Sequence, residues 1–137
     1  MRYTAAYGSN LNREHMRMLC PSAEFVTVSG LSGWRLVFRG KFLTLEKAEG
    51  FTVPVGIWKI TDADEKALDA WENYPEEYYK EYISPDCFIY LMHEHMPYSL
   101  PDDDYLEMCI SGYEDAGFDT TFIREAYLFS AKKLNQY

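Results

Sequence analysis

The chain has few cysteines and lacks a long apolar run. Its 137 residues include three cysteines, Cys20, Cys87 and Cys109, which are widely spaced and form no CxxC pair. An odd, scattered set argues against a disulfide framework and against a thiolate zinc site, so a reducing cytoplasm is the expected location. No apolar stretch approaches the ~20 residues of a membrane span, and the first strand is too short and too polar for a signal peptide.

Positive charge is also scarce. The chain carries 13 Lys and Arg against 22 Asp and Glu, for a formal net charge of −9. The resulting negative field repels phosphate backbones and anionic lipid, so neither nucleic acid nor a membrane surface is an expected partner. A hydrophobic content of 47% with 17% aromatic residues excludes disorder. The length predicts a single domain over residues 1–137.

The order of the expected elements is typical of an α+β chain, with strands mostly first and helices mostly last. Asp62 is the expected N-cap of the second helix, with Glu65 as the partner in its capping box, and a turn is expected between Gly30 and Gly33. Many short strands suggest a curled sheet or a small mixed β-barrel of about five to seven strands with flanking helices. Strands are expected at residues 2–7, 25–28, 34–38, 42–45, 53–60, 78–83 and 87–92, and helices at 12–19, 62–73, 101–116 and from 119 onward.

A glycine turn follows the first expected strand, in the run Tyr7, Gly8, Ser9, Asn10 and Leu11. Such a turn exposes successive backbone N–H groups just before a helix and can hold an anion or a carbonyl oxygen. The plainer alternative is that Gly8 only lets the strand end and that Ser9 or Asn10 caps the helix. A GxSxG elbow is absent, which argues against a serine nucleophile.

Glu72 lies near the end of the second expected helix, at the border of an apolar face made by Ala67, Leu68 and Trp71. In contrast, Asp62 and Glu65 are expected in the exposed first turn. A partly desolvated carboxylate at such a border has a raised pKa and shuttles protons well near neutral pH. The alternative is an ordinary solvated glutamate in an acidic chain.

Two further sets of residues could carry chemistry. His93 and His95 flank Glu94 just before Pro97, but they lack a third ligand at a familiar spacing, so no metal site is predicted, and the lone His15 is treated in the same way. Tyr105 could present its hydroxyl to a ligand, although packing explains most of the 12 tyrosines. Cys87 and Cys109 are expected to be small core residues.

Together these segments resemble the γ-glutamylcyclotransferase-like family over nearly the whole chain. The similarity begins with Ala6-Tyr7-Gly8-Ser9-Asn10-Leu11 and continues at residues 55–60, at residues 68–74 with Glu72, and at 78–80, 87–92, 101–105 and 117–118. Asn73 departs from the pattern, because the family usually has glycine after the glutamate, and residues 75–79 are unusually acidic and aromatic.

The resemblance implies a function and a site. Glu72 would be the catalytic acid/base, Tyr7, Gly8, Ser9, Asn10 and Leu11 would form the substrate loop, and Tyr105 would line the pocket. The implied reaction cyclises the γ-glutamyl group of a small-molecule γ-glutamyl amide or dipeptide to 5-oxoproline, with release of the amine or amino acid and without a cofactor. A γ-glutamyl amine from an antibiotic precursor or an isopeptide fits equally well, and a non-catalytic binding module on the same fold is the alternative.

Overall fold

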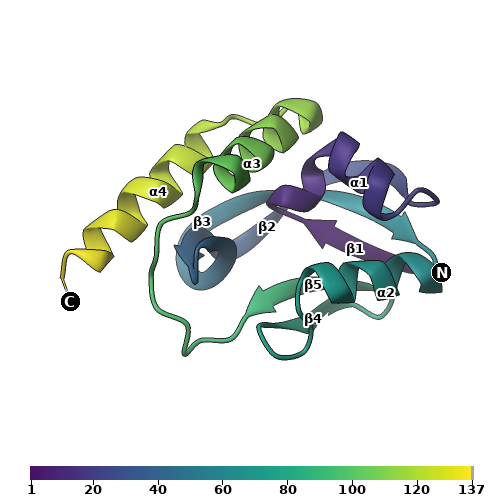
Figure 1. Ribbon diagram of the computed structural model, residues 1–137, viewed down its shortest axis with the longest axis horizontal. Coiled ribbons are helices and arrows are strands. Elements are labelled where there is room, and N and C mark those ends of the chain that lie inside the picture. Colours follow the sequence, from purple (N-terminus) through teal and green to yellow (C-terminus); the bar gives the residue numbers. More distant parts are fainter. Residues whose placement is uncertain (137) are drawn as a thin grey trace.

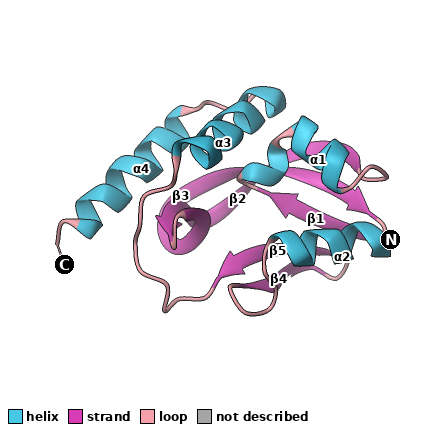
Figure 2. Ribbon diagram, in the orientation of Figure 1, coloured by secondary structure: helices cyan, strands magenta, loops and turns pink. Residues whose placement is uncertain are grey.

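The computed structural model describes residues 1–136, which form a curled five-stranded sheet with helices packed around it (Figures 1 and 2). The α+β class expected from the sequence is therefore confirmed. The strands are β1 (Arg2–Ala6), β2 (Glu24–Arg39), β3 (Phe42–Ile60), β4 (Tyr78–Ser84) and β5 (Cys87–Met92), in the sheet order β2-β3-β1-β5-β4. The helices are the 3₁₀ turn η1 (Ser9–Leu11), α1 (Arg13–Leu19), α2 (Asp62–Trp71), α3 (Asp103–Ala116) and α4 (Thr121–Leu134).

The β2–β3 pair corrects the expectation of four short strands between residues 25 and 60. Both strands are long, and their antiparallel pairing runs from Glu24 with Lys59 to Arg39 with Phe42. Gly33 has a φ of 85° and lies where the register shifts, so it forms an irregularity inside the strand. A positive-φ glycine occurs in bulges as well as in turns, so the prediction of a turn between Gly30 and Gly33 is wrong.

The start of α2 also differs from the expectation. Thr61, not Asp62, is the N-cap, and its capping box is completed by the buried Asp64. Glu65 is therefore free to face the sheet, where its carboxylate binds Arg2 and Lys80 at 2.6 Å each. The prediction of an exposed Glu65 in a capping box is wrong. Asp64 lies three residues after Thr61, just as Glu65 lies three residues after Asp62, so both pairs have the spacing of a capping box. The ion pairs of Glu65 with Arg2 and Lys80 decide between them.

The helix ends earlier than expected, at Trp71 instead of residue 73, and Glu72 is its C-cap. Asn73 then adopts a φ of 52°, in the left-handed region that asparagine tolerates better than most residues other than glycine. This turn brings the chain back toward β4, so Glu72 lies at the corner between α2 and the sheet.

The helices cover the sheet in two groups. Figure 1 shows α3 and α4 together along one side of the β2–β3 pair and α2 beside β4 and β5. The Phe38 N–H of β2 donates to the Ser130 hydroxyl of α4 at 2.8 Å, and the Tyr113 hydroxyl of α3 donates to the Tyr7 carbonyl at 2.8 Å. The end of β1 is thus fixed from the helical side. No helix in residues 1–136 is long and apolar enough to cross a membrane.

Candidate active site

The segment after β1 forms a tight turn with two unused backbone donors. The N–H groups of Leu11 and Asn12 close η1 on the carbonyls of Gly8 and Ser9, at 3.0 Å each. Among the hydrogen bonds of the described residues, the N–H groups of Ser9 and Asn10 have no acceptor. These two groups precede α1, and unpaired N–H groups in such a turn can donate to a ligand oxygen.

Two tryptophans hold this turn in place. The Trp58 indole on β3 donates to the Asn10 carbonyl at 2.9 Å, and the Trp71 indole at the end of α2 lies 3.5 Å from the Ser9 hydroxyl. The loop is therefore attached to the sheet on one side and to the helix that carries Glu72 on the other.

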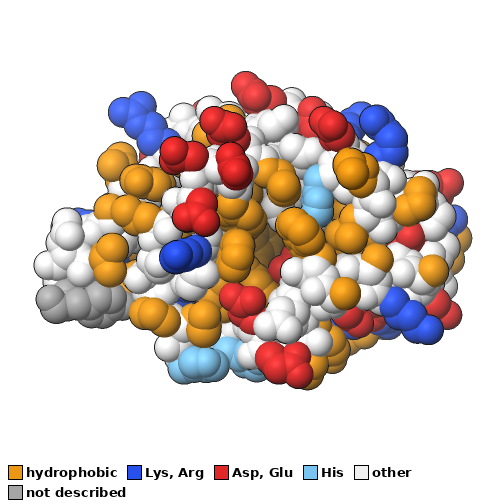
Figure 3. Space-filling model, viewed as in Figure 1, with side chains coloured by type: hydrophobic (Ala, Val, Ile, Leu, Met, Phe, Trp, Pro, Cys, Tyr) orange, Lys and Arg blue, Asp and Glu red, His pale blue; other side chains and the backbone are white. Residues whose placement is uncertain are grey.

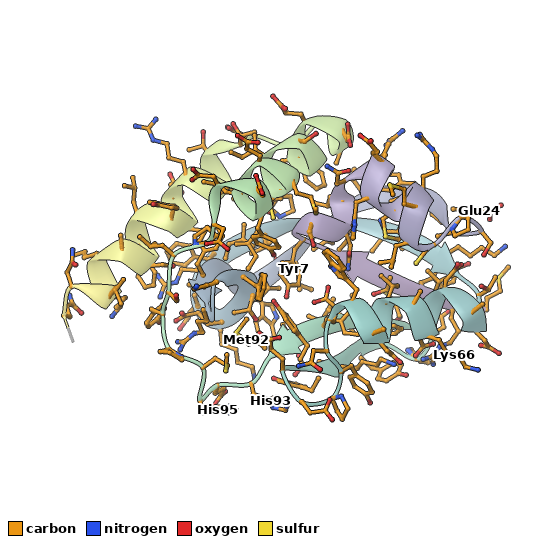
Figure 4. The ribbon with its side chains drawn as sticks, in the orientation of Figure 1. Tyr7, Glu24, Lys66, Met92, His93 and His95 are labelled. Atoms are coloured by element: carbon orange, nitrogen blue, oxygen red, sulfur yellow. The ribbon has the colours of Figure 1, made fainter. Side chains whose placement is uncertain are left out.

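A small pocket of about 20 Å³ opens beside the loop. Figure 3 shows a hollow in the middle of the viewed face, with hydrophobic and acidic side chains around it, and Figure 4 places Tyr7 in this central region. The pocket is lined by Ala5, Ala6, Tyr7, Gly8, Ser9, Asn10, Leu43, Glu72, Tyr78, Tyr90 and Tyr105. Its aliphatic side chains are those of Ala5, Ala6 and Leu43, while four phenols, Ser9, Asn10 and Glu72 supply polar groups that can orient a ligand.

Glu72 faces the substrate loop across this pocket. Its Oε1 accepts a hydrogen bond from Asn10 Nδ2 at 3.0 Å. Burial raises the pKa of the Glu72 carboxyl to about 7, while the Asn10 bond opposes the shift and the charge of Glu77 adds to it. A carboxyl with a pKa near neutrality exchanges protons readily in both directions at physiological pH.

The phenols around the pocket are held in fixed orientations. Tyr7 donates to the Tyr90 carbonyl at 2.6 Å and Tyr78 donates to the Leu43 carbonyl at 2.8 Å. The Tyr105 hydroxyl instead accepts the Leu43 N–H at 3.1 Å, so it keeps its own proton to donate. Burial raises the pKa of Tyr7, Tyr78 and Tyr105, so all three stay protonated at neutral pH.

A second pocket of about 190 Å³, the outer pocket, adjoins the first, the inner pocket. Ser9, Glu72, Tyr78 and Tyr105 line both, so the Glu72 carboxyl lies where the two pockets meet. The outer pocket is completed by Phe42, Trp71 and Glu77. A ligand that spans the two pockets can thus place the bond between its two ends beside Glu72.

Comparison with known proteins identifies the family. The profile of "Gamma-glutamyl cyclotransferase, AIG2-like" proteins matches residues 4–107. The chain belongs to this family. The match includes the loop at residues 7–11, Glu72 and Tyr105, so the family resemblance inferred from the motifs is confirmed. A search of curated protein sequences found no significant match.

Solved structures of the family share the fold. A human protein described as "uncharacterized protein loc79017" superposes with a TM-score of 0.75 at 22% identity, covering 91% of this chain and 85% of its own. A structure named "Gamma-glutamyl cyclotransferase" gives 0.71 at 22% identity with the same coverage. An AIG2-like protein from Mus musculus gives 0.54 at 20% identity, covering 77% of this chain and 82% of its own. Identities this low support a common fold alone.

The structure brings together most of the residues predicted for the family site. Tyr7, Gly8, Ser9, Asn10, Glu72 and Tyr105 all line the inner pocket. Leu11 is not among its lining residues: its side chain is 1% exposed and packs in the core. His93 and His95 lie on the loop after β5 (Figure 4), and no group of three or more His, Cys, Asp or Glu in residues 1–136 could hold a metal ion. Burial of Cys87 and Cys109 agrees with their predicted place in the core, and Cys20 is buried as well.

Sequence reasoning missed several pocket residues. Leu43, Tyr78 and Tyr90 line the inner pocket from three different strands. Alternation along β5 could have indicated that Tyr90 shares a face with Phe88, but no local pattern relates a strand residue to the loop after β1. His15 was also set aside, although its ring lies against Trp71 and its Nε2 lies 3.0 Å from Asn10 Oδ1.

Proposed function

We propose that this protein is a γ-glutamylcyclotransferase-type enzyme, which converts the γ-glutamyl group of a γ-glutamyl amide to 5-oxoproline and releases an amine or amino acid. The observation that carries the proposal is the Glu72 carboxyl, raised in pKa to about 7 and held 3.0 Å from Asn10 where the inner and outer pockets meet. Family membership over residues 4–107 supports the same reaction class.

The substrate supplies its own nucleophile and electrophile. The glutamyl α-amine attacks the γ-carbonyl carbon, a C–N bond forms, and the five-membered lactam closes. Because the α-amine has a pKa near ~8 and is mostly protonated at neutral pH, a base must take a proton before or during attack. If the inner pocket holds the glutamyl group of the substrate in a bent conformation, with its amine near its γ-carbonyl, binding removes much of the entropic cost of ring closure.

Glu72 is the proposed acid/base. Its carboxylate accepts a proton from the attacking amine, and its carboxylic acid then donates that proton to the departing nitrogen as the original amide C–N bond breaks. The proton is conserved, so Glu72 is ionised again after each turnover. The scheme calls for no cofactor, because both reacting groups belong to the substrate.

The loop and the phenols would stabilise the charge that develops on the carbonyl oxygen. The N–H groups of Ser9 and Asn10 and the Tyr105 hydroxyl are donors next to the same pocket. Donors that are already oriented lower the energy of an oxyanion without reorganisation during the reaction. Leu11 contributes only by packing the loop into the core in this scheme.

The test is a panel of γ-glutamyl amides with different leaving groups, incubated with the purified chain and assayed for 5-oxoproline by mass spectrometry. We expect release of 5-oxoproline and of one equivalent of amine from at least one member of the panel. Tight binding of these amides without any turnover would overturn the proposal and indicate a non-catalytic binding module.

A further inference from the structure

His15 lies behind the substrate loop, on the opposite side of Asn10 from Glu72. It belongs to the first turns of α1. Its backbone N–H donates to the side-chain oxygen of Asn12, the N-cap of the helix, at 2.9 Å, so this group is not available to a ligand. Its ring is half-buried against Trp71, with ring centroids 4.5 Å apart. Its Nε2 points at Asn10 Oδ1 over 3.0 Å.

The Asn10 amide therefore bridges two functional groups. Its Nδ2 donates to Glu72 Oε1, which leaves Oδ1 facing His15. An amide oxygen only accepts hydrogen bonds, so His15 Nε2 must carry the proton in this pair. A flipped amide would direct its oxygen at the Glu72 carboxylate and its NH₂ group at the Nε2 proton, and both contacts would be lost.

We propose that His15 is a positioning residue for Glu72, which locks the Asn10 amide in the orientation that donates a hydrogen bond to the Glu72 carboxylate. The inference rests on the proposed acid/base function of Glu72 and adds a residue outside the family's loop and glutamate. Both the neutral Nε2–H form and the cation of His15 can donate to Asn10, so the lock does not depend on the charge of His15. Burial lowers the pKa of His15 and favours the neutral form.

Other ionisable groups act on the same two residues. The groups that interact with Glu72 come from the loops after β1 and α2 and from β4, β5 and α3, and are Tyr7, Glu77, Tyr78, Tyr90, Tyr105 and Cys109. Those that share the surface groove of His15 are Glu14, Asp104 and Glu107. His15→Phe and His15→Gln both remove the imidazole and leave these other groups in place, so a difference between the two variants reports on the hydrogen bond to the Asn10 amide.

The experiment compares three variants by carbon NMR of the Glu72 side-chain carboxyl in the free protein. His15→Phe keeps a ring against Trp71 but cannot donate, whereas His15→Gln places an amide N–H near the position of Nε2. Met18→Ala, at an 81% exposed position on the same helix, is the control. We expect His15→Phe to raise the titration midpoint of Glu72 by roughly one pH unit, and His15→Gln and Met18→Ala to leave it close to that of the wild type.

Activity provides a second readout. The acid limb of the kcat/KM profile should move to higher pH by the same amount in His15→Phe, with recovery of the rate at high pH and in His15→Gln. An unchanged midpoint in His15→Phe, or an equal shift in His15→Gln, would overturn the inference. If the wild type cyclises no γ-glutamyl amide, the proposed function fails, but the NMR titration still decides whether His15 acts through Asn10.

Discussion

At the scale of single residues, Glu72 is held in an environment that favours its protonated form and costs stability. Its pKa of about 7 in the folded chain exceeds the ordinary value of 4.5, because the half-buried carboxyl is poorly solvated. The Asn10 hydrogen bond offsets only part of this effect. The same burial that makes the carboxyl a good proton shuttle therefore destabilises the fold when the carboxyl ionises.

A pH–rate profile should reveal this carboxyl directly. Since the base form of Glu72 starts the reaction, kcat/KM should rise with pH through a midpoint of about 7. Steady-state kinetics with one γ-glutamyl amide between pH 5 and 9 gives the midpoint. A profile that is flat from pH 5 to pH 7 would mean that another group accepts the proton.

Stability should respond to Glu72 in the opposite sense from activity. The folded-state pKa lies above the unfolded value, so the folded chain is favoured while the carboxyl is protonated and loses stability as the pH rises from about 4.5 through about 7. Glu72→Gln removes this loss and should stabilise the protein by about 2 to 3 kcal/mol at pH 8. Urea unfolding at pH 8 and at pH 4 measures it, and an equal effect at both values would contradict the assigned pKa.

At the scale of the elements, the site depends on the contact between α3 and the loop after β1. Gly112 lies where α3 crosses η1, and a Cβ there would lie 2.8 Å from the Asn12 nitrogen and 3.0 Å from the Leu11 carbonyl carbon. Both neighbours are backbone atoms, which cannot yield as a flexible side chain would. The absent side chain at this position lets the helix hold the loop against the pocket.

Replacing Gly112 by alanine should therefore displace the loop. We expect Gly112→Ala to lower the free energy of unfolding by about 1 to 3 kcal/mol, despite the higher helix propensity of alanine, and to raise KM. Ser111→Ala, at an exposed position on the same helix, is the matched control and should leave both unchanged. If Gly112→Ala keeps the wild-type stability and KM, then α3 does not lie as close to the Leu11–Asn12 backbone as the structure indicates.

The sequence predicts where helices and strands occur better than it predicts how they connect and pair. Local signals, such as the turn at Gly8 and the continuous apolar run of residues 87–92, correctly indicate β1, β5 and the loop between β1 and α1. The continuity of β2 and β3 depends on cross-strand pairing over 16 and 19 residues, and a glycine allows either a bulge or a turn.

The site follows the same rule. Glu72 and the loop residues could be found because each belongs to a contiguous motif. Tyr78, Tyr90 and His15 could not, because their places in the site depend on how distant elements pack together. The burial of Leu11 in the core could not be predicted for the same reason, since a sequence motif does not show which of its side chains face the pocket.

At the scale of the whole molecule, negative charge shapes the choice of substrate. The net charge is −9, and among the described residues that line the inner and outer pockets none is Lys or Arg. Glu77 instead places a carboxyl in the outer pocket, where the leaving group would lie. A carboxylate on the leaving side would find no cation there and would be repelled by this charge.

The chain should therefore prefer γ-glutamyl amines to γ-glutamyl amino acids with matched side chains. We expect a difference in kcat/KM of roughly tenfold or more at low salt, and a smaller one in high salt, where the long-range part of the repulsion is screened. Competition assays with such pairs at two ionic strengths measure this preference. Equal use of both substrates at low salt would contradict the electrostatic argument.

The central claim is that Glu72 moves the proton during ring closure, and the most direct measurement is single-turnover lactam formation by Glu72→Gln beside the binding affinity for the same γ-glutamyl amide. The amide side chain keeps the shape of the glutamate and can still accept the Asn10 hydrogen bond, but it cannot take up a proton. The account predicts a fall in rate of at least ~10² with affinity nearly unchanged. A variant that forms 5-oxoproline at close to the wild-type rate would contradict it, and the base would have to be sought at Glu77 or Glu76.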